Sequence, residues 1–355
     1  RDKRRVAGAT PAARQPLSAG WCREVNRGPR GIERGTTGGA PMRMLFVMDP
    51  LDRIHVNGDS TYMVMRECSD RGMHVAMCTP DDLYARHGEG WARVTPVRTT
   101  AEAPYFHTSE PVEAALGEFD IVWMRKDPPF DMTYIFATYL LDMTPASTLV
   151  VNDPVGLKVF NEKLWAMAFP ELHPTTLLSK DTARLRQFVE AAPGRVVLKP
   201  WDGNGGRGII VTDQDDRNLG SLLDLLTNEG RDAVIAQHYQ AAIAQGDKRI
   251  LLFDGEPVGA VLRVPGKRDH RGNMHVGASI ERTELTAADT RIVDTLRPHL
   301  KKHGLLFVGI DVIGDKLTEI NITSPTGIQE INRLDGKRLE ADLVDCAVAA
   351  HQENS

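Results

Sequence analysis

The length and composition of the chain limit the classes of protein to which it can belong. With 355 residues it is long enough for about two or three domains and a large core. Hydrophobic residues make up 41% and charged residues 26%, and no uncharged apolar run approaches the roughly 20 residues of a membrane span. The net charge of -5 argues against nucleic acid as a partner. Four scattered cysteines exclude a disulfide framework and favour a reducing compartment, so we expect a cytoplasmic protein.

A change in charge separates the first 41 residues from the rest of the chain. This segment holds nine basic and three acidic residues, a net charge of +6, which leaves -11 for the remainder. It is rich in Gly, Pro and Ala and has neither helical nor strand periodicity, so we expect a disordered basic leader over residues 1–41. We favour a dispensable leader or an artefact of the assumed translation start. An Arg-rich targeting peptide or a nucleic-acid arm is the alternative.

The next segment alternates apolar strands with helical patterns. Residues 44–48 form a continuous apolar run that stops at Asp49 and Pro50, as expected for a buried parallel strand. Residues 59–61 supply N-cap chemistry for a helix that ends at Gly72. Further strands are predicted over 74–78, 121–124 and 148–152. The pattern predicts an open α/β sheet.

Polar side chains follow the carboxyl ends of these strands. Asp49 follows the first strand, Arg125 and Lys126 follow the third, and Asn152 ends the fourth. In open α/β sheets ligands bind beyond the carboxyl ends of the strands. The sequence therefore predicts a ligand site at this edge.

A glycine-rich connection joins two strands in the second half of the chain. A strand over 196–200 leads through a loop, 201–208, into a strand over 209–211. Glycine amides can approach phosphate oxygens closely, and Lys199 can add a positive charge. The loop is neither a P-loop nor a dinucleotide fingerprint, because it lacks Gly-Lys-Ser/Thr and is followed by a strand. A phosphate-covering hairpin and a plain turn both remain open.

Acidic residues interrupt an apolar hairpin near the C-terminus. We predict a strand over 306–313, a three-residue loop over 314–316 and a second strand over 317–322. This register places Asp311 opposite Glu319 and Gly309 opposite Asn321, so the polar side chains share one face. Facing carboxylates with an amide fit Mg²⁺ bridging phosphates. A two-residue loop would move Asp311 to the other face, and solvated carboxylates on an exposed sheet are the alternative.

A series of short motifs runs in order along the chain. It comprises residues 48–50, 125–131, 161–164, 198–200, 202–206, 246–249, 271–273 and 318–326. Together these motifs resemble bacterial glutathione synthetase of the ATP-grasp superfamily, from about Met44 to the C-terminus. The glycine loop and the acidic hairpin indicate only ATP-grasp. The sequences RKDPPFD at 125–131 and TSPT at 323–326 indicate glutathione synthetase within that superfamily.

The resemblance implies a fold, an activity and an assembly. We expect an α/β chain of the α+β ATP-grasp type, with an N-terminal open α/β substrate domain followed by lid and catalytic domains. The boundaries are a leader over 1–41 and domains over 42–160, 161–237 and 238–355. The implied enzyme is a glutathione synthase, an ATP-dependent ligase that joins γ-glutamylcysteine and glycine through an acyl phosphate and releases ADP and phosphate. A homotetramer is implied as well.

Two alternatives to this activity stay open at the level of sequence. Another ATP-grasp carboxylate-amine ligase, of the D-alanine or glutamate ligase type, shares the same motifs. A nucleotide-binding regulatory protein with a dead site is the second alternative, and the intact lysines and acidic hairpin argue against it.

The resemblance also assigns nucleotide and metal ligands. Lys163 and Lys199 match the lysines that hold ATP phosphates, and the phosphates would be covered by Gly203, Gly205 and Gly206. The segment whose backbone meets adenine matches Gln237, His238, Tyr239 and Gln240, and Asp247 matches the ribose partner. The residues that carry two Mg²⁺ ions, for which Mn²⁺ can substitute, match Asp311, Glu319 and Asn321.

Substrate residues follow from the same resemblance. The γ-glutamyl end is assigned to Asp59, Ser60, Thr61, Arg125 and Asn152, and the reacting and glycine end to Lys248, Arg249, Ser324 and Thr326. Three arginines are candidates for catalysis at the transferring phosphoryl group: Arg249, Arg263 and Arg271. Residues 264–278 form a basic loop expected to close over the acyl phosphate and exclude water, or else a flexible linker. Ser279 stands where the family often carries a further arginine.

Overall fold

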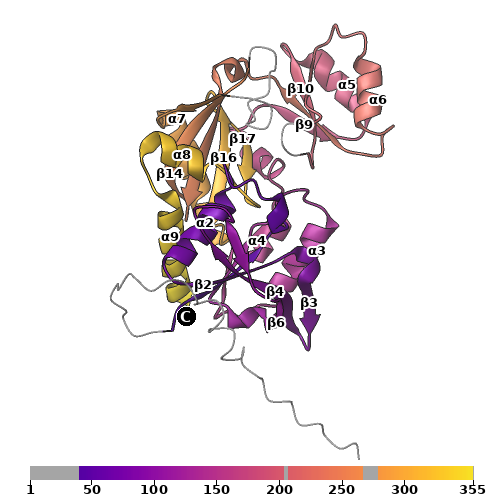
Figure 1. The fold of residues 1–355 in the computed structure, drawn as a ribbon. Helices are drawn as coiled ribbons and strands as arrows, with labels where there is room; N and C mark the ends of the chain where they lie inside the picture. The colour runs from indigo at the N-terminus through magenta and orange to yellow at the C-terminus, as the bar shows by residue number, and fades with distance from the viewer. Residues whose placement is uncertain (1–39, 204–206, 267–278, 355) are drawn as a thin grey trace, which may run out of the picture. The chain divides into compact units, whose positions relative to one another are not determined.

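The computed structural model describes residues 40–203, 207–266 and 279–354. Residues 41–355 form one compact unit that contains three β-sheets (Figure 1). The predicted leader lies outside the described residues, except for its last two positions. No helix in these ranges is both long and apolar enough to cross a membrane.

The first sheet has a parallel centre, as predicted. Strand β1 (Arg43–Val47) pairs with β2 (His74–Cys78) on one side and with β7 (Ile121–Met124) on the other, and β8 (Leu149–Val151) pairs with β7. Each predicted strand is confirmed to within one residue at either end. The strand order reverses between β1 and β7, which is where open α/β sheets place their ligands.

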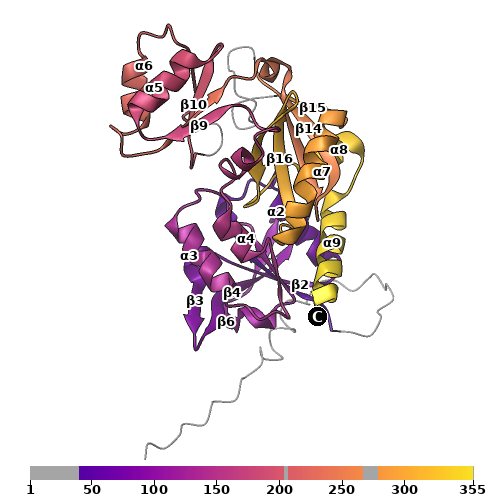
Figure 2. The same cartoon turned by 180° about the vertical axis from the view of Figure 1, so that it is seen from behind.

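Helices cover both faces of this sheet. The predicted helix is α2 (Ser60–Asp70), capped by the Asp59 carboxylate, which accepts a hydrogen bond from Tyr62 N at 2.7 Å. Helix α3 (Met132–Leu141) follows β7, and α4 (Pro154–Val159) follows β8. Figures 1 and 2 show α2 on one side of the sheet and α3 with α4 on the other.

An antiparallel extension of this sheet is absent from the sequence prediction. It consists of β3 (Leu83–Arg86), β4 (Glu89–Thr99), β5 (Phe106–Thr108) and β6 (Val112–Ala115). Strand β4 pairs with β2 and with the three others. Because β4 largely alternates buried with more exposed side chains, it lacks the continuous apolar run that marks the parallel strands.

The second sheet contains the glycine-rich connection. Its order is β11-β10-β12-β9, with β9 (Thr176–Ser179), β10 (Val196–Pro200), β11 (Ile210–Thr212) and β12 (Val234–His238). The predicted strand, loop, strand arrangement is confirmed, because β10 and β11 pair antiparallel. Helices α5 (Thr182–Ala191) and α6 (Leu219–Leu226) contribute apolar side chains to the core of this sheet.

The third sheet is antiparallel and ends in the acidic hairpin. Its order is β15-β14-β13-β16-β17, with β13 (Asp247–Phe253), β14 (Glu256–Val264), β15 (Ser279–Arg282), β16 (Phe307–Ile313) and β17 (Lys316–Asn321). Three helices accompany it: α7 (Ala287–Lys302), α8 (Ile328–Asp335) and α9 (Leu339–Asn354). Short 3-10 segments lie at Leu51–Arg53, Pro80–Asp82, Leu116–Glu118, Trp165–Ala168 and Ala241–Gln245.

One hydrophobic core joins the first sheet to the third. It contains Phe46 and Trp123 from the first sheet, whose stacked rings lie 5.8 Å apart, together with Phe307 from β16. Helix α9, from the end of the chain, adds Leu343 and packs against α2, β7 and β8. The carboxyl edge of the first sheet is therefore held against the third sheet by shared apolar packing.

Asn152 forms a polar link within this joint. Its side-chain nitrogen donates to Phe307 O at 2.8 Å and to Ile322 O at 2.7 Å, and its oxygen accepts from Phe307 N at 2.8 Å. The side chain is buried, so no water replaces these bonds when they are lost.

We predict that Asn152→Leu destabilises the protein by about 3 kcal/mol, because three buried backbone groups lose their partners. Urea unfolding followed by circular dichroism measures this loss. Asn57→Leu, at an exposed asparagine, is the control and should change the stability by less than about 0.5 kcal/mol. Equal midpoints for the two variants would contradict the linking role of Asn152.

Candidate functional site

The predicted metal ligands meet on the hairpin of β16 and β17. Asp311 pairs with Glu319 and Gly309 pairs with Asn321, as predicted. Asn321 Nδ2 also donates to Asp311 Oδ2 at 3.3 Å. Glycine at 309 leaves room for Arg249, because a Cβ there would lie 3.2 Å from the Cδ of that arginine. The hairpin thus gathers oxygen atoms beside a guanidinium group.

The predicted loop of this hairpin is wrong, although the predicted pairing is right. The loop has two residues rather than three, since Ile313 pairs with Lys316. A bulge at Thr318 inserts one residue into β17 and restores the alignment of Asp311 with Glu319. The Thr318 hydroxyl donates to Asp311 O at 3.1 Å across the bulge. The alternative drawn from a two-residue loop, with Asp311 on the other face, fails for this reason.

Two arginines from neighbouring strands neutralise Asp311. Arg249 on β13 donates from Nε to Oδ1 at 2.5 Å and from Nη2 to Oδ2 at 3.0 Å, and Arg263 on β14 lies 3.0 Å from Oδ1. Burial alone would raise the pKa of Asp311, but the two guanidinium groups outweigh it and hold the pKa well below its usual range. Asp311 is therefore a carboxylate at neutral pH.

Arg263 also binds Asp247, the predicted ribose partner. Arg263 Nη2 donates to Asp247 Oδ2. Burial raises the pKa of Asp247 to about 6, although Arg263 acts to lower it. Asp247 Oδ1 and Arg263 Nε are buried without a hydrogen-bond partner within the described part of the chain. Unpaired buried polar atoms are costly, which favours a polar ligand here.

The first predicted phosphate lysine contacts the hairpin from the segment that follows α4. Lys163 Nζ is 2.9 Å from Glu319 Oε1 and also donates to Gly203 O. Burial lowers the pKa of Lys163, but the carboxylate of Glu319 outweighs it, so the net shift is upward and the amine stays charged. Gly203 is thereby tied to the acidic hairpin, whereas Gly205 and Gly206 lie outside the described residues.

Glu162 is a site residue that the sequence prediction did not assign. Its Oε1 accepts from Ile322 N at 2.9 Å, from Thr323 N at 3.0 Å and from the Thr323 hydroxyl at 2.8 Å. Burial, and then the charge of Glu319, raise the pKa of Glu162. An acidic residue next to a phosphate lysine was the available signal. Its carboxylate fixes the chain just beyond β17.

The second predicted phosphate lysine, Lys199, is half-buried on β10. Its Nζ donates to Gln237 Oε1 on β12 at 3.3 Å. Burial lowers the pKa of Lys199 to about 8, which Glu319 offsets and Lys163 reinforces. Unlike Lys163, this lysine is paired with a neutral amide.

The predicted adenine segment continues from β12. His238 N donates to Thr175 O at 2.9 Å, and Tyr239 N donates to Arg195 O at 3.0 Å. The Arg195 guanidinium lies 4.0 Å from the centre of the Tyr239 ring. Gln240 Nε2 donates to His238 O at 2.9 Å. Backbone hydrogen bonds to the residues that precede β9 and β10 therefore hold this segment in place.

Arg125 organises the predicted γ-glutamyl end. It lies at the reversal point of the first sheet, where Nε donates to Thr61 Oγ1 at 3.0 Å and Nη2 donates to Pro325 O at 2.9 Å. Ser324 donates to Arg125 O at 3.4 Å. Ser60 Oγ accepts from Ile328 N at 3.4 Å. These predicted residues therefore lie together, although Asp59 is engaged as the α2 cap.

The remaining polar residues at this edge form an ion pair. Lys126 Nζ lies 3.0 Å from Asp49 Oδ1. Asp127 N donates to Asp49 Oδ2 at 3.1 Å. The predicted meeting of polar groups at the ends of β1 and β7 is thus confirmed.

Several predicted residues are not brought to this site. Lys248 binds Asp289 on α7 and donates to Glu284 O at 3.0 Å, because strand alternation directs it away from the face that carries Arg249. Asn152 uses both amide hydrogens on backbone carbonyls. Thr326 contributes its backbone oxygen, which accepts from Arg249 Nη1 at 3.2 Å. Ser279 begins β15, and Arg271 lies outside the described residues.

The donor atoms of the hairpin decide whether it can hold the predicted metal. Within the described ranges, no three His, Cys, Asp or Glu side chains are grouped so that they could hold a metal ion. The predicted set has two facing carboxylates and one amide, and oxygen donors of this kind fit Mg²⁺ when phosphates complete the shell. Lys163, Arg249 and Arg263 neutralise the same carboxylates here.

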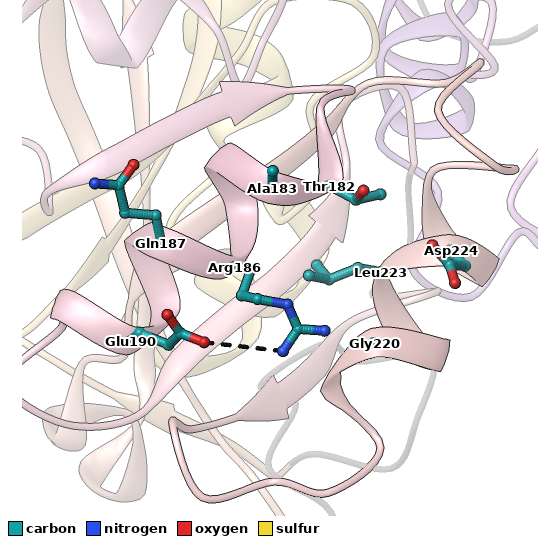
Figure 3. Close-up of a pocket in the computed structure, with 8 residues that line it drawn as sticks. All are labelled: Thr182, Ala183, Arg186, Gln187, Glu190, Gly220, Leu223 and Asp224. Atoms are coloured by element: carbon teal, nitrogen blue, oxygen red, sulfur yellow. Dashed lines mark ion pairs between the residues drawn. The ribbon is translucent and has the colours of Figure 1, made fainter.

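A surface pocket lies elsewhere, between α5 and α6 (Figure 3). Its volume is about 290 Å³, and Arg186 and Glu190 form a 3.9 Å ion pair at its wall. It is lined by Thr182, Ala183, Arg186, Gln187, Glu190, Gly220, Leu223 and Asp224. It shares no residue with the predicted site.

Comparison with known proteins identifies close relatives. Residues 42–158 match the family model of the prokaryotic glutathione synthetase N-terminal domain, and residues 162–336 match its ATP-grasp domain. The glutathione synthetase of Thermosynechococcus vestitus is 41% identical, covering 84% of this chain and 97% of that protein. The glutathione synthetase of Agrobacterium fabrum is 44% identical, covering 84% and 93%.

Solved structures share the fold at low identity. The ATP-grasp ligase PsnB, complexed with a minimal precursor, has a TM-score of 0.57 at 17% identity, covering 87% of this chain and 98% of that one. D-cycloserine synthetase DcsG has a TM-score of 0.59 at 14% identity, covering 88% and 100%. The predicted ATP-grasp fold is confirmed.

Proposed function

The chain belongs to the prokaryotic glutathione synthetase family and is an ATP-dependent ligase of glutathione synthesis, and from that premise we propose how its residues perform the reaction. In the proposed reaction the cysteinyl carboxylate of γ-glutamylcysteine takes the γ-phosphoryl group of ATP and ADP leaves. The amine of glycine then attacks the acyl carbon, losing a proton, and phosphate leaves. The protein supplies position and charge for both steps.

The charged groups around the hairpin support the phosphate end of this proposal. Lys163 and Lys199 would bind the ATP phosphates, and Arg249 and Arg263 would face the transferring group. Asp311, Glu319 and Asn321 would hold Mg²⁺, which when bound neutralises charge on the phosphoryl group. The single observation that carries the proposal is the alignment of Asp311 with Glu319 beside the buried Arg249 and Arg263 and the half-buried Lys163.

Arg125 would hold the γ-glutamyl end of the peptide. It lies at the reversal point of the first sheet and is buried next to Thr61 and Ser324. Burial lowers the pKa of Arg125, yet a guanidinium remains charged at neutral pH. A buried cation gains most from an anionic partner, and a carboxylate of the peptide has the matching geometry.

The proposed domains are 42–160, 161–237 and 238–355. Each of the three sheets falls within one of these segments, apart from the last residue of β12, which supports the division.

We also propose that the enzyme acts in the cytoplasm. The described cysteines, Cys68, Cys78 and Cys346, are all free thiols, as a reducing compartment favours.

The direct test of the activity is phosphate release from ATP with the purified protein and Mg²⁺. We expect release and glutathione formation only when γ-glutamylcysteine and glycine are supplied together, with glutathione identified by mass spectrometry. The competing assignment, a D-alanine or glutamate ligase, predicts release with those amines or acids and none with γ-glutamylcysteine. That outcome would overturn the proposed substrates.

We predict that Glu319→Gln lowers turnover at least a hundredfold and leaves the melting temperature within a few degrees, because a facing carboxylate and the partner of Lys163 are lost together. Steady-state kinetics at saturating Mg²⁺ measure the change. Glu190→Gln, in the pocket between α5 and α6, is the matched control and should keep full activity. Near-normal turnover of Glu319→Gln would contradict the metal assignment.

The depressed pKa of Lys199 predicts a pH dependence of ATP binding. Only the charged amine attracts phosphate, so the dissociation constant for ATP should be flat near pH 7. It should rise above pH 8, by at most about tenfold for each pH unit. Calorimetric titration measures it. Lys199→Arg, charged throughout, should remove this rise, and an unchanged profile in that variant would exclude Lys199 as its source.

A homotetramer remains a proposal, supported by an exposed apolar surface on α3 and α4. This surface consists of Met132, Phe136 and Tyr139 on α3, with Val155 and Val159 on α4. Large exposed apolar patches favour association. A second copy of the chain is the partner that the family resemblance implies.

We predict that Phe136→Ser weakens self-association at least tenfold, because a large apolar side chain no longer leaves water on assembly. Sedimentation equilibrium measures the association constant. Leu225→Ser, at a leucine on α6 that is at least as exposed as Phe136, is the control and should leave the association constant unchanged. A monomeric parent protein, or equal effects of the two variants, would contradict this assignment.

A further inference from the structure

A chain of hydrogen bonds leads from Lys199 to a buried histidine that the sequence prediction did not assign. Gln237 accepts from Lys199 Nζ through Oε1 at 3.3 Å. At the other end of the same amide, Nε2 lies 3.1 Å from His173 Nε2 and 3.0 Å from Thr176 Oγ1. His173 and Gln237 are only 6% and 5% exposed.

The charge of Lys199 sets the order of donors and acceptors in this chain, because an ammonium group can only donate and so requires the oxygen of the Gln237 amide. The Thr176 hydroxyl donates to Pro174 O at 2.8 Å, so its oxygen accepts from the Gln237 amide. The second amide hydrogen then points to His173 Nε2, which must be an acceptor. The imidazole is therefore neutral, with its proton on Nδ1, 3.4 Å from Thr176 Oγ1. This ordering leaves Oε1 of Gln237 for Lys199.

The electrostatics agree with this ordering. Burial, reinforced by the nearby charge of Lys199, lowers the pKa of His173 to about 4. The ring is thus neutral at pH 7 and can accept a hydrogen bond through Nε2. Without that acceptor the amide of Gln237 could rotate by half a turn. Its NH₂ group would then face the ammonium of Lys199, two donors in contact.

We propose that His173 is a positioning residue, which with Thr176 fixes the amide of Gln237 so that its oxygen holds the ammonium group of Lys199. The inference rests on the proposed binding of ATP phosphates by Lys199. Gln237 thereby acquires a side-chain role in addition to the backbone role predicted from the sequence. His173 acts through Gln237 and touches neither nucleotide nor peptide.

The first test measures the dissociation constant for Mg-ATP by calorimetry, with no acceptor substrate present. His173→Leu removes the acceptor, and we expect this constant to rise about tenfold, with turnover at saturating ATP within about twofold of the parent. His173→Gln carries a carbonyl oxygen at the reach of Nε2 and should restore binding to within about threefold. His74→Leu, at an equally buried histidine on β2, is the control and should leave binding unchanged.

A double-mutant cycle separates positioning from general damage. Gln237→Leu should weaken ATP binding at least as much as His173→Leu. Adding His173→Leu to it should have no further effect, because the histidine acts only through the amide. Thr176→Val, which is nearly isosteric, should weaken binding about threefold and provides the test if His173→Leu does not fold. The proposal would be overturned if the fold-changes of the two single variants in the dissociation constant for ATP multiplied in the double variant. It would also be overturned if both Thr176→Val and a folded His173→Leu bound ATP like the parent.

The outcomes also distinguish this inference from the proposed function. A parent protein that binds ATP but forms no glutathione would contradict the proposed reaction and leave the binding cycle valid. A parent protein that binds no ATP would overturn both. If the parent protein forms glutathione normally and His173→Leu binds ATP as tightly as the parent, this inference alone would be overturned.

Discussion

The arrangement of the site depends on the neutralisation of two facing carboxylates, of which Asp311 is buried and Glu319 is half-buried. Asp311 and Glu319 face each other across a hairpin, where like charges repel and burial is costly. Arg249 and Arg263 compensate the first, and Lys163 compensates the second. These cations come from strands β13 and β14 and from the segment before the second sheet. The charge requirement therefore fixes how several remote parts of the chain meet.

The bulge at Thr318 shows how backbone geometry serves that requirement. A two-residue turn alone would align Asp311 with the wrong neighbour, since each shift by one residue turns a side chain to the opposite face. The extra residue restores the facing pair, and the Thr318 hydroxyl bonds across it to the Asp311 backbone. The hairpin thus combines a tight turn with aligned ligands.

Local patterns were predictable, whereas most long-range side-chain partners were not. The strands at 74–78 and 121–124 were predicted to the residue, because continuous apolar runs mark buried parallel strands. Strand β4 was not predicted, because an alternation of buried and more exposed side chains is a weaker signal for a strand than a continuous apolar run. The partners of Glu162 and His173 were also missed, since they are brought together only by folding. The pairing of Asp311 with Glu319 was predicted correctly, although the prediction assumed a three-residue loop and the hairpin has a two-residue loop.

The two predicted phosphate lysines differ in their partners, and the difference has a chemical consequence. Burial lowers the pKa of both lysines. The carboxylate that Lys163 binds outweighs this effect and raises its pKa, whereas Lys199 binds the neutral amide of Gln237 and burial lowers its pKa to about 8. A carboxylate in place of Gln237 would hold the proton of Lys199 but would compete with, and repel, an incoming phosphate. A neutral amide fixes the amine without satisfying its charge. The ammonium of Lys199 therefore gains more from an anionic ligand than that of Lys163, which makes the orientation of the amide, and so of His173, important for binding.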